Sequence, residues 1–176
     1  MEKEKRNILI SGLPGIGKTT LIKKIYQELK NNSPIGFYTE EIRNEGQRKG
    51  FQLIGLNGHR TIFAHVLIES SYHVGKYRVD IEAFDKFLDS LNLKNSKNNL
   101  IIIDEIGKME CLSSKFIKLI WETLDSDNLV IATISHTDGG IKGKIKQRED
   151  VELFKMNLDN RESIFTEILD KIRQYS

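Results

Sequence analysis

Residues 12–19 have the residue types and the spacing that bind a phosphate group. Their sequence, GLPGIGKT, matches the pattern G-x-x-x-x-G-K-[ST] in full. An apolar run precedes the segment and a helical pattern follows it, which is the context that this motif requires. Glycines let backbone N–H groups curl around an anion, and the N-terminus of the following helix adds partial positive charge. In such a site Lys18 can reach the β- and γ-phosphates, and the Thr19 hydroxyl can ligate Mg²⁺.

Two adjacent carboxylates, Asp104 and Glu105, end an apolar run in the segment IIIDEIGKME. A buried strand that ends in charge usually ends at a site, and open α/β sheets bind ligands at this edge. Asp104 can hold the Mg²⁺ shell through Thr19 or a water. Glu105 could take a proton from an attacking water, an effect worth roughly 10²–10⁴ in rate. The alternative for Glu105 is an ion pair with Lys18 or Lys108.

The transition state of phosphoryl transfer usually needs an Arg or a further Lys to balance its charge. Residues 136–150, HTDGGIKGKIKQRED, form a glycine-containing basic loop that could act as a lid. The candidates for the stabilising charge are Lys142, Lys144, Lys146 and Arg148 in this loop, and Arg43, Arg48 and Arg161 outside it. For each of them the alternative is an ordinary solvated cation. Thr133 and Ser135 are candidates for a sensor of the γ-phosphate.

The residues DEIG also fit the D-x-x-G pattern of GTP-binding switches. The guanine-reading pattern N-K-x-D is missing, and the only segment similar to it is SHTD at residues 135–138, where Ser135 and His136 replace the Asn and Lys. A dedicated GTPase is therefore not expected, and no base-reading motif indicates a preferred nucleotide.

The hydrophobic pattern predicts the elements that must position these residues. Apolar runs predict strands over residues 6–11, 99–104, 128–135 and 151–156, and helical spacing predicts helices between them and at the C-terminus. Asp80, and Ser113 or Ser114, are suited to cap two of the helices. Residues 35–66 have the pattern of an antiparallel β-meander that contains an Asn-Gly hairpin turn. This order of elements predicts an α/β fold, with a mainly parallel sheet and helices on both faces.

Composition and charge limit the class of protein. The chain has 176 residues, of which 39% are hydrophobic, and this fits a single domain over residues 1–176 with the meander as an insertion. Its 27 basic and 25 acidic side chains give a formal charge of +2, without the basic excess that is typical of nucleic-acid binders. Cys111 is the single cysteine, which rules out an internal disulfide. Neither Cys111 nor the four histidines have metal-ligand spacing.

The N-terminal sequence MEKEKRN does not have the pattern of a signal peptide, and the apolar runs are too short to cross a bilayer. We therefore expect a cytoplasmic protein without a membrane span. We also expect a monomer or a weak homo-oligomer that does not depend on nucleic acid.

The chain resembles a known family from end to end. The segments that carry the likeness are GLPGIGKTTLI, GFYTEEIR with RKGFQLIGLNG, VGKYRVD, IIIDEIGKMECLS and QREDVELFKMNLDNRES. They are similar to the small P-loop nucleoside-triphosphatases first described from thermophiles, a family that includes a human cancer-related nucleoside-triphosphatase. The chain departs from the family at Cys111, where a larger hydrophobe is usual, and in SHTDGGIKG.

The resemblance implies a RecA-like α/β core and Mg²⁺-dependent hydrolysis of the γ-phosphate of ATP, GTP and other nucleoside triphosphates. It makes Glu105 the base, with Lys18, Lys108 and Arg148 as further catalytic residues, and it places Glu110 at a motif position. The metal ligands would be Thr19 and Asp104. The implied nucleotide-binding residues are Gly12, Leu13, Pro14, Gly15, Ile16, Gly17, Lys18, Thr19, Thr20, Leu100, Ile101, Ile102, Ile103, Asp104, Glu105, Ile106, Gly107, Asn160 and Arg161.

Two other functions would use the same phosphate-binding segment. A nucleoside or small-molecule kinase could use residues 136–150 as a lid and YTEEIR to bind the phosphoryl acceptor. An ATPase stimulated by a nucleic acid or by a protein partner would use slow hydrolysis only to reset a conformation. Glu105 beside Asp104 favours hydrolysis over a kinase, and stimulation of turnover by RNA, DNA or a protein partner would point to the stimulated ATPase.

Overall fold

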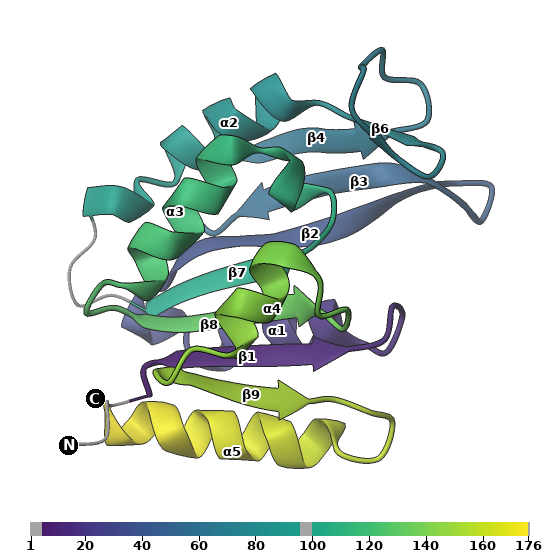
Figure 1. Cartoon of the computed structure of the whole chain (residues 1–176). Helices are drawn as coiled ribbons and strands as arrows, with labels where there is room; N and C mark the ends of the chain where they lie inside the picture. Colours follow the sequence, from purple (N-terminus) through teal and green to yellow (C-terminus); the bar gives the residue numbers. More distant parts are fainter. Residues whose placement is uncertain (1–4, 96–99, 176) are drawn as a thin grey trace.

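The computed structural model describes residues 5–95 and 100–175, which form one nine-stranded mixed sheet with helices on both faces (Figure 1). The strands are β1 (Asn7–Gly12), β2 (Ile35–Asn44), β3 (Gln47–Gly55), β4 (Arg60–His65), β5 (His73–Val74), β6 (Tyr77–Val79), β7 (Leu100–Ile106), β8 (Leu129–Ser135) and β9 (Val151–Lys155). The helices are α1 (Lys18–Glu28), α2 (Ile81–Ser90), α3 (Ser114–Leu124), α4 (Gly140–Lys146) and α5 (Arg161–Gln174). The α/β fold predicted from the sequence is confirmed. Residue 99, the first residue of the strand expected over residues 99–104, lies outside the described residues.

Five adjacent strands form the parallel part of the sheet, in the order β2-β7-β8-β1-β9. These strands are rich in Ile, Leu and Val because helices cover both faces. The strand β8 lies between β1 and β7. The ends of β1 and β7 are therefore two strand spacings apart at the same edge of the sheet. This edge, at the carboxyl ends of the parallel strands, is where such sheets bind ligands.

The β-meander continues this sheet and does not form a separate layer. Its first strand, β2, pairs in parallel with β7 over residues 35–37 and antiparallel with β3. The meander also extends beyond the predicted range 35–66, because β5 and β6 add two short antiparallel strands next to β4. The expected hairpin turn joins β3 to β4, with Gly58 at φ 88° and its N–H bonded to the Gly55 carbonyl at 2.9 Å.

Two hydrophobic cores hold the helices against the sheet. On one face α2, α3 and α4 pack against side chains such as Leu9, Ile101 and Val130. On the other face α1 and α5 pack against Ile8, Ile102 and their neighbours. In Figure 1 the helices α2, α3 and α4 lie in front of the sheet and α1 lies behind it. None of the described helices is long and apolar enough to span a membrane.

Both predicted helix caps are present. Asp80 accepts a hydrogen bond from the Ala83 N–H at 2.9 Å at the start of α2. Ser113, one of the two serines considered, accepts from the Phe116 N–H at 3.0 Å and caps α3. The loop expected over residues 136–150 is wrong in its central part, which is the helix α4. There Ile145 is fully buried and Gly143 packs closely on the Asp138 carbonyl, a contact that a larger residue would prevent.

Candidate functional site

Residues 12–19 span the end of β1, a tight turn over residues 13–17 and the start of α1, and they are called the phosphate-binding loop here. Gly15 and Gly17 have φ values of 75° and 102°, which a residue with a Cβ atom rarely adopts. The helix α1 begins directly after Gly17, and no side chain caps its first turn. Its first backbone N–H groups therefore keep their capacity to bind an anion, and the helix dipole adds partial positive charge there.

The side chain of Lys18 is buried within this loop, with 8% of its surface exposed. Its Nζ donates to the carbonyl oxygens of Gly12 and Leu13, at 3.0 and 3.3 Å. The same Nζ lies 3.7 Å from Oε2 of Glu105. The ion pair considered for Glu105 from the sequence is therefore present, and it places Glu105 next to the phosphate-binding loop.

Asp104 is fully buried where β7 reaches the carboxyl edge. Its carboxylate accepts hydrogen bonds from the Thr19 hydroxyl at 2.7 Å, the Thr133 hydroxyl at 2.6 Å and the Thr39 N–H at 3.3 Å. Burial raises the pKa of Asp104, and the hydrogen bonds from Thr133 and Thr19 oppose that rise. These bonds tie α1, β8 and β2 to one carboxylate at the end of β7. Thr133, considered from the sequence as a sensor of the γ-phosphate, therefore bonds to Asp104.

Two further carboxyl groups lie beside Asp104. Burial raises the pKa of Glu105, while the nearby Lys18 ammonium lowers it. Glu110 has only 6% of its surface exposed, and its burial, together with the charge of Glu105, raises its pKa well above the usual range. The two side chains both lie beside Gly107, where an added Cβ would lie 2.6 Å from Glu110 Oε2 and 2.7 Å from Glu105 Oε1.

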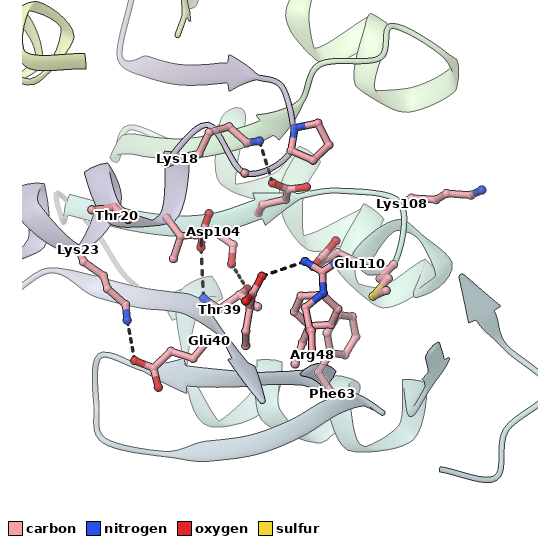
Figure 2. A pocket seen from close by; sticks show the side chains of 18 of the residues that line it. Lys18, Thr20, Lys23, Thr39, Glu40, Arg48, Phe63, Asp104, Lys108 and Glu110 are labelled. Atoms are coloured by element: carbon pink, nitrogen blue, oxygen red, sulfur yellow. Dashed lines mark hydrogen bonds and ion pairs between the residues drawn. The ribbon is translucent and has the colours of Figure 1, made fainter. Parts of the chain in front are cut away.

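A cavity of about 680 Å³ joins these residues to the meander (Figure 2). The predicted residues that line it are Pro14, Gly15, Gly17, Lys18, Thr19, Thr20, Asp104, Glu105 and Lys108. The other lining residues are Lys23, Thr39, Glu40, Glu41, Arg48, Phe51, Phe63, Val74, Met109 and Glu110. The volume lies within the range of pockets that bind small molecules and cofactors.

Several predicted residues do not line this cavity. Residues 100–103 point into the two cores from within β7, and Ile106 is buried as well. Gly12 and Leu13 line a second cavity of about 440 Å³ between the loop and α4. Lys108 does line the cavity, but Figure 2 shows its exposed side chain pointing away from the other labelled side chains.

Arg148 is not brought to the site. It forms ion pairs with Asp125 at 2.8 Å and Asp150 at 2.6 Å, and it bonds to the Leu124 carbonyl. These partners lie at the end of α3 and before β9, at the edge of the sheet where the parallel strands begin. Arg148 therefore joins elements at the edge opposite to the phosphate-binding loop, so we do not carry it forward as a catalytic residue.

Near the C-terminus, Arg161 and Asn160 have different environments. Arg161 lies against the phosphate-binding loop, with Nη1 3.3 Å from where a Cβ of Gly17 would be. The Asn160 side chain closes the turn before α5, since it accepts from the Asn157 N–H at 2.8 Å and donates to the Lys155 carbonyl at 2.9 Å. Arg161 thus lies beside the phosphate-binding loop, whereas Asn160 holds the turn before α5.

The lysines of residues 136–150 mainly stabilise their own segment. Lys146 donates to Asp138 at 2.6 Å and to the carbonyl oxygens of His136 and Thr137. Lys142 donates to the Thr137 hydroxyl at 2.6 Å and lies close enough to Glu105 to lower its pKa.

Sequence analysis alone did not assign Thr39 to the site or recognise that Glu110 is buried there. The run GFYTEE carries a signal for Thr39, because it places polar and charged residues in a strand that begins next to β7. Glu110 gives a weaker signal, since burial of a carboxyl group after a strand cannot be read from residue type.

Comparison with known proteins agrees with this geometry. Residues 7–169 match the model of a family described as NTPase. The chain is 46% identical over 167 residues to the nucleoside-triphosphatase THEP1 of Thermotoga sp. strain RQ2, covering 94% of this chain and 95% of that protein. It is 34% identical to the human cancer-related nucleoside-triphosphatase, covering 93% of this chain and 95% of that one.

Comparison of the folds also indicates similarity to these nucleoside-triphosphatases. The crystal structure of THEP1 from Aquifex aeolicus superposes with a TM-score of 0.83 at 35% identity, covering 93% of this chain and 97% of that chain. Fold and site together define an α/β nucleotide-binding protein. More particularly, the chain belongs to the NTPase family that contains the THEP1 proteins and the human cancer-related nucleoside-triphosphatase.

Proposed function

We propose that this protein hydrolyses Mg²⁺-bound nucleoside triphosphates to the diphosphate and phosphate, with broad tolerance for the base. Membership of the NTPase family supports the reaction class. The observation that carries the proposal is the position of Glu105, whose Oε2 lies 3.7 Å from Lys18 Nζ in a cavity lined by the phosphate-binding loop.

Glu105 would act as the general base for the attacking water. Its carboxylate is partly exposed, at 34%, so a water can reach it from the cavity. Burial raises its pKa and thereby makes it a stronger base than a solvated glutamate. Once a triphosphate is bound, Lys18 would contact the β- and γ-phosphates in place of the carbonyl oxygens of Gly12 and Leu13.

The residues present fit a Mg²⁺ ion. Asp104 and Thr19 place a carboxylate and a hydroxyl side by side, with their oxygens 2.7 Å apart, at the edge of the cavity. Within the described ranges 5–95 and 100–175 no cluster of three or more His, Cys, Asp or Glu side chains could hold a metal alone. This suits Mg²⁺, which is typically bound by one or two protein ligands together with substrate phosphates and waters. When bound, the ion would neutralise charge on the β- and γ-phosphate oxygens.

Release of phosphate from ATP, GTP, CTP and UTP tests the proposal, measured with Mg²⁺ or with EDTA and without any acceptor or polymer. We expect all four nucleotides to be hydrolysed with Mg²⁺ and none with EDTA. A chain that binds nucleotide yet releases no phosphate by itself would contradict the proposal. Hydrolysis of one base only would contradict the broad tolerance.

A kinase is the second candidate, because the cavity extends past Thr39 to Arg48, Phe51 and Phe63. This part of the cavity is larger than one attacking water needs, and a phosphoryl acceptor could occupy it. An added acceptor that suppresses phosphate release and yields a phosphomonoester would favour the kinase. Stimulation of turnover by RNA, DNA or a protein would instead favour the third alternative, a stimulated ATPase.

A further inference from the structure

The cavity contains few cations that could contact a γ-phosphate. Among the described residues that line it, the basic side chains are Lys18, Lys23, Arg48 and Lys108. Lys18 belongs to the phosphate-binding loop, and the exposed Lys108 side chain points away from the other labelled side chains in Figure 2. Lys23 donates to Glu40 at 2.6 Å and lies over the Tyr38 ring. Arg48 is therefore the cation of this set that remains to be explained.

Arg48 is held in a defined position by groups on three strands. Its Nε donates to the Tyr77 hydroxyl at 2.9 Å, and its Nη1 donates to Oε1 of Glu41 at 2.9 Å. The guanidinium also lies 5.2 Å from the Phe51 ring centroid and 5.7 Å from that of Tyr77. Packing against this pair of rings restricts a long side chain before ligand binds, so less conformational freedom is lost when it forms a new bond.

The sheet places the partner of Arg48 just beyond the catalytic edge. Thr39 bonds to Asp104 through both its N–H and its hydroxyl, which fixes β2 next to the end of β7. Glu41 lies two residues further along β2 and therefore on the same face as Thr39, about 7 Å beyond it. Because β2 runs parallel to β7, Glu41 extends past the carboxyl edge, on the side where a γ-phosphate bound near Glu105 would lie.

Glu41 has a second cationic partner, which makes the release of Arg48 easier. Its Oε2 accepts from Arg43, at 2.6 Å from Nη2 and 2.8 Å from Nε, while Oε1 accepts from Arg48. If Arg48 moved away, Glu41 would keep a paired charge and would not become an isolated carboxylate, which is the costly situation in a partly buried site. Arg48 itself is 44% exposed, so water can solvate its guanidinium when the bond to Glu41 breaks.

We propose that Arg48 leaves Glu41 when a nucleoside triphosphate binds and donates to a γ-phosphate oxygen in the transition state. The chain would thus supply its own catalytic arginine from the β-meander. This inference rests on the proposed hydrolysis. Lys142 is not a candidate for this contact, because it does not line the cavity; its charge, on α4, lies close enough to Glu105 to lower the pKa of that carboxyl group. A guanidinium suits the task, since it presents several donors in a plane to phosphate oxygens.

Steady-state kinetics with MgATP on the full chain test this assignment, with Arg48→Met, Arg48→Lys and the control Arg78→Met. Arg78 is an exposed meander arginine that bonds to the Ser70 carbonyl and does not line the cavity. For Arg48→Met we expect kcat to fall roughly 10²-fold or more, as for loss of one transition-state donor. KM should change less than about threefold, and ADP should no longer be trapped by aluminium fluoride. Arg48→Lys should recover little, because an ammonium is a point charge.

Each outcome decides the assignment. A kcat for Arg48→Met within about threefold of the wild type would overturn it, and so would an equal loss in Arg78→Met, which would indicate a general effect on the meander. If wild type releases no phosphate, the proposed hydrolysis has failed and not this inference alone. Should Arg48→Met fail to fold, as checked by circular dichroism, Arg48→Gln retains polar contacts with Glu41 and Tyr77 and takes its place under the same criteria.

Discussion

Glu110 and Glu105 share a small space around Gly107, and this has a consequence for stability. Burial raises the pKa of Glu110 well above its usual range, and the charge of Glu105 adds to the effect. A carboxyl group whose pKa is raised by folding binds protons more tightly in the folded chain. Its contribution to stability is therefore complete below its unfolded pKa and is lost as pH rises toward the folded pKa.

This sign gives a prediction for Glu110→Gln. The variant should match the wild type in stability at about pH 4.5, near the ordinary glutamate pKa. It should then become progressively more stable than the wild type toward pH 8, since it never carries the buried charge. Urea unfolding across this pH range measures the difference, with the exposed Glu28→Gln of α1 as the control. A stability difference between Glu110→Gln and wild type that does not grow with pH would contradict the explanation.

At the scale of elements, the site depends on the contact between β2 and β7. Gly36 has φ 126° at this contact, and an added Cβ would lie 1.8 Å from the Ile102 carbonyl oxygen. Gly36→Ala should therefore force the two strands apart and destabilise the chain by about 3 kcal/mol or more, while also loosening Thr39 from Asp104. The urea midpoint and slope measure this loss.

Gly46 provides the matched control for that substitution. It also has a positive φ, 76°, in the turn between β2 and β3, but an added Cβ would contact nothing within 4 Å. Gly46→Ala should cost only about 1–2 kcal/mol, the strain of a left-handed residue. Equal losses in the two variants would show that backbone strain, and not the contact between strands, explains the effect.

The sequence predicted well those elements that have a long run of regularly spaced apolar residues and a clear capping residue. Asp80 and Ser113 cap α2 and α3 as expected, because a side-chain oxygen before an amphipathic run is a local signal. The strands β5 and β6 have two and three residues, too few to show a period. The helix α4 was missed because its seven residues include two glycines, which lower helix propensity.

At the site, residues that share a contiguous motif could be predicted, whereas residues brought together only by tertiary packing could not. The loop of residues 12–19 was predictable because its motif is contiguous, and the position of Asp104 and Glu105 followed from the end of β7. Arg148 was not predictable, because its distance from the loop is set by how β9 and α3 pack. For the same reason only the fold distinguishes Arg48 from the other basic candidates.

At the scale of the whole molecule, a bound nucleotide should stabilise the entire sheet, since the proposed phosphate site adjoins Asp104, whose bonds to Thr19 and Thr133 join α1, β7 and β8. A non-hydrolysable ATP analogue at 100 times its Kd should add about 2.7 kcal/mol. For a chain of this size the melting temperature should then rise by roughly 5–11 °C. Differential scanning fluorimetry with Mg²⁺ measures the shift. Lys18→Ala should reduce it strongly, and a shift of equal size in that variant would contradict the assigned phosphate site.

The site as described is built from residues of one chain, and we therefore expect the monomer to be active. Light scattering at the concentration of the activity assay tests this expectation. Activity that appears only in an oligomeric fraction would contradict it and would point to a residue supplied by a second copy.

If Glu105 activates the attacking water, replacing it with Gln should slow hydrolysis without weakening nucleotide binding. We would measure MgATP binding and single-turnover phosphate release for wild type, Glu105→Gln and Glu40→Gln, the last removing another carboxylate from the same cavity. Glu105→Gln should bind MgATP about as tightly as wild type but release phosphate roughly 10²–10⁴ times more slowly, while Glu40→Gln should stay close to wild type. Phosphate release by Glu105→Gln at nearly the wild-type rate would contradict the account.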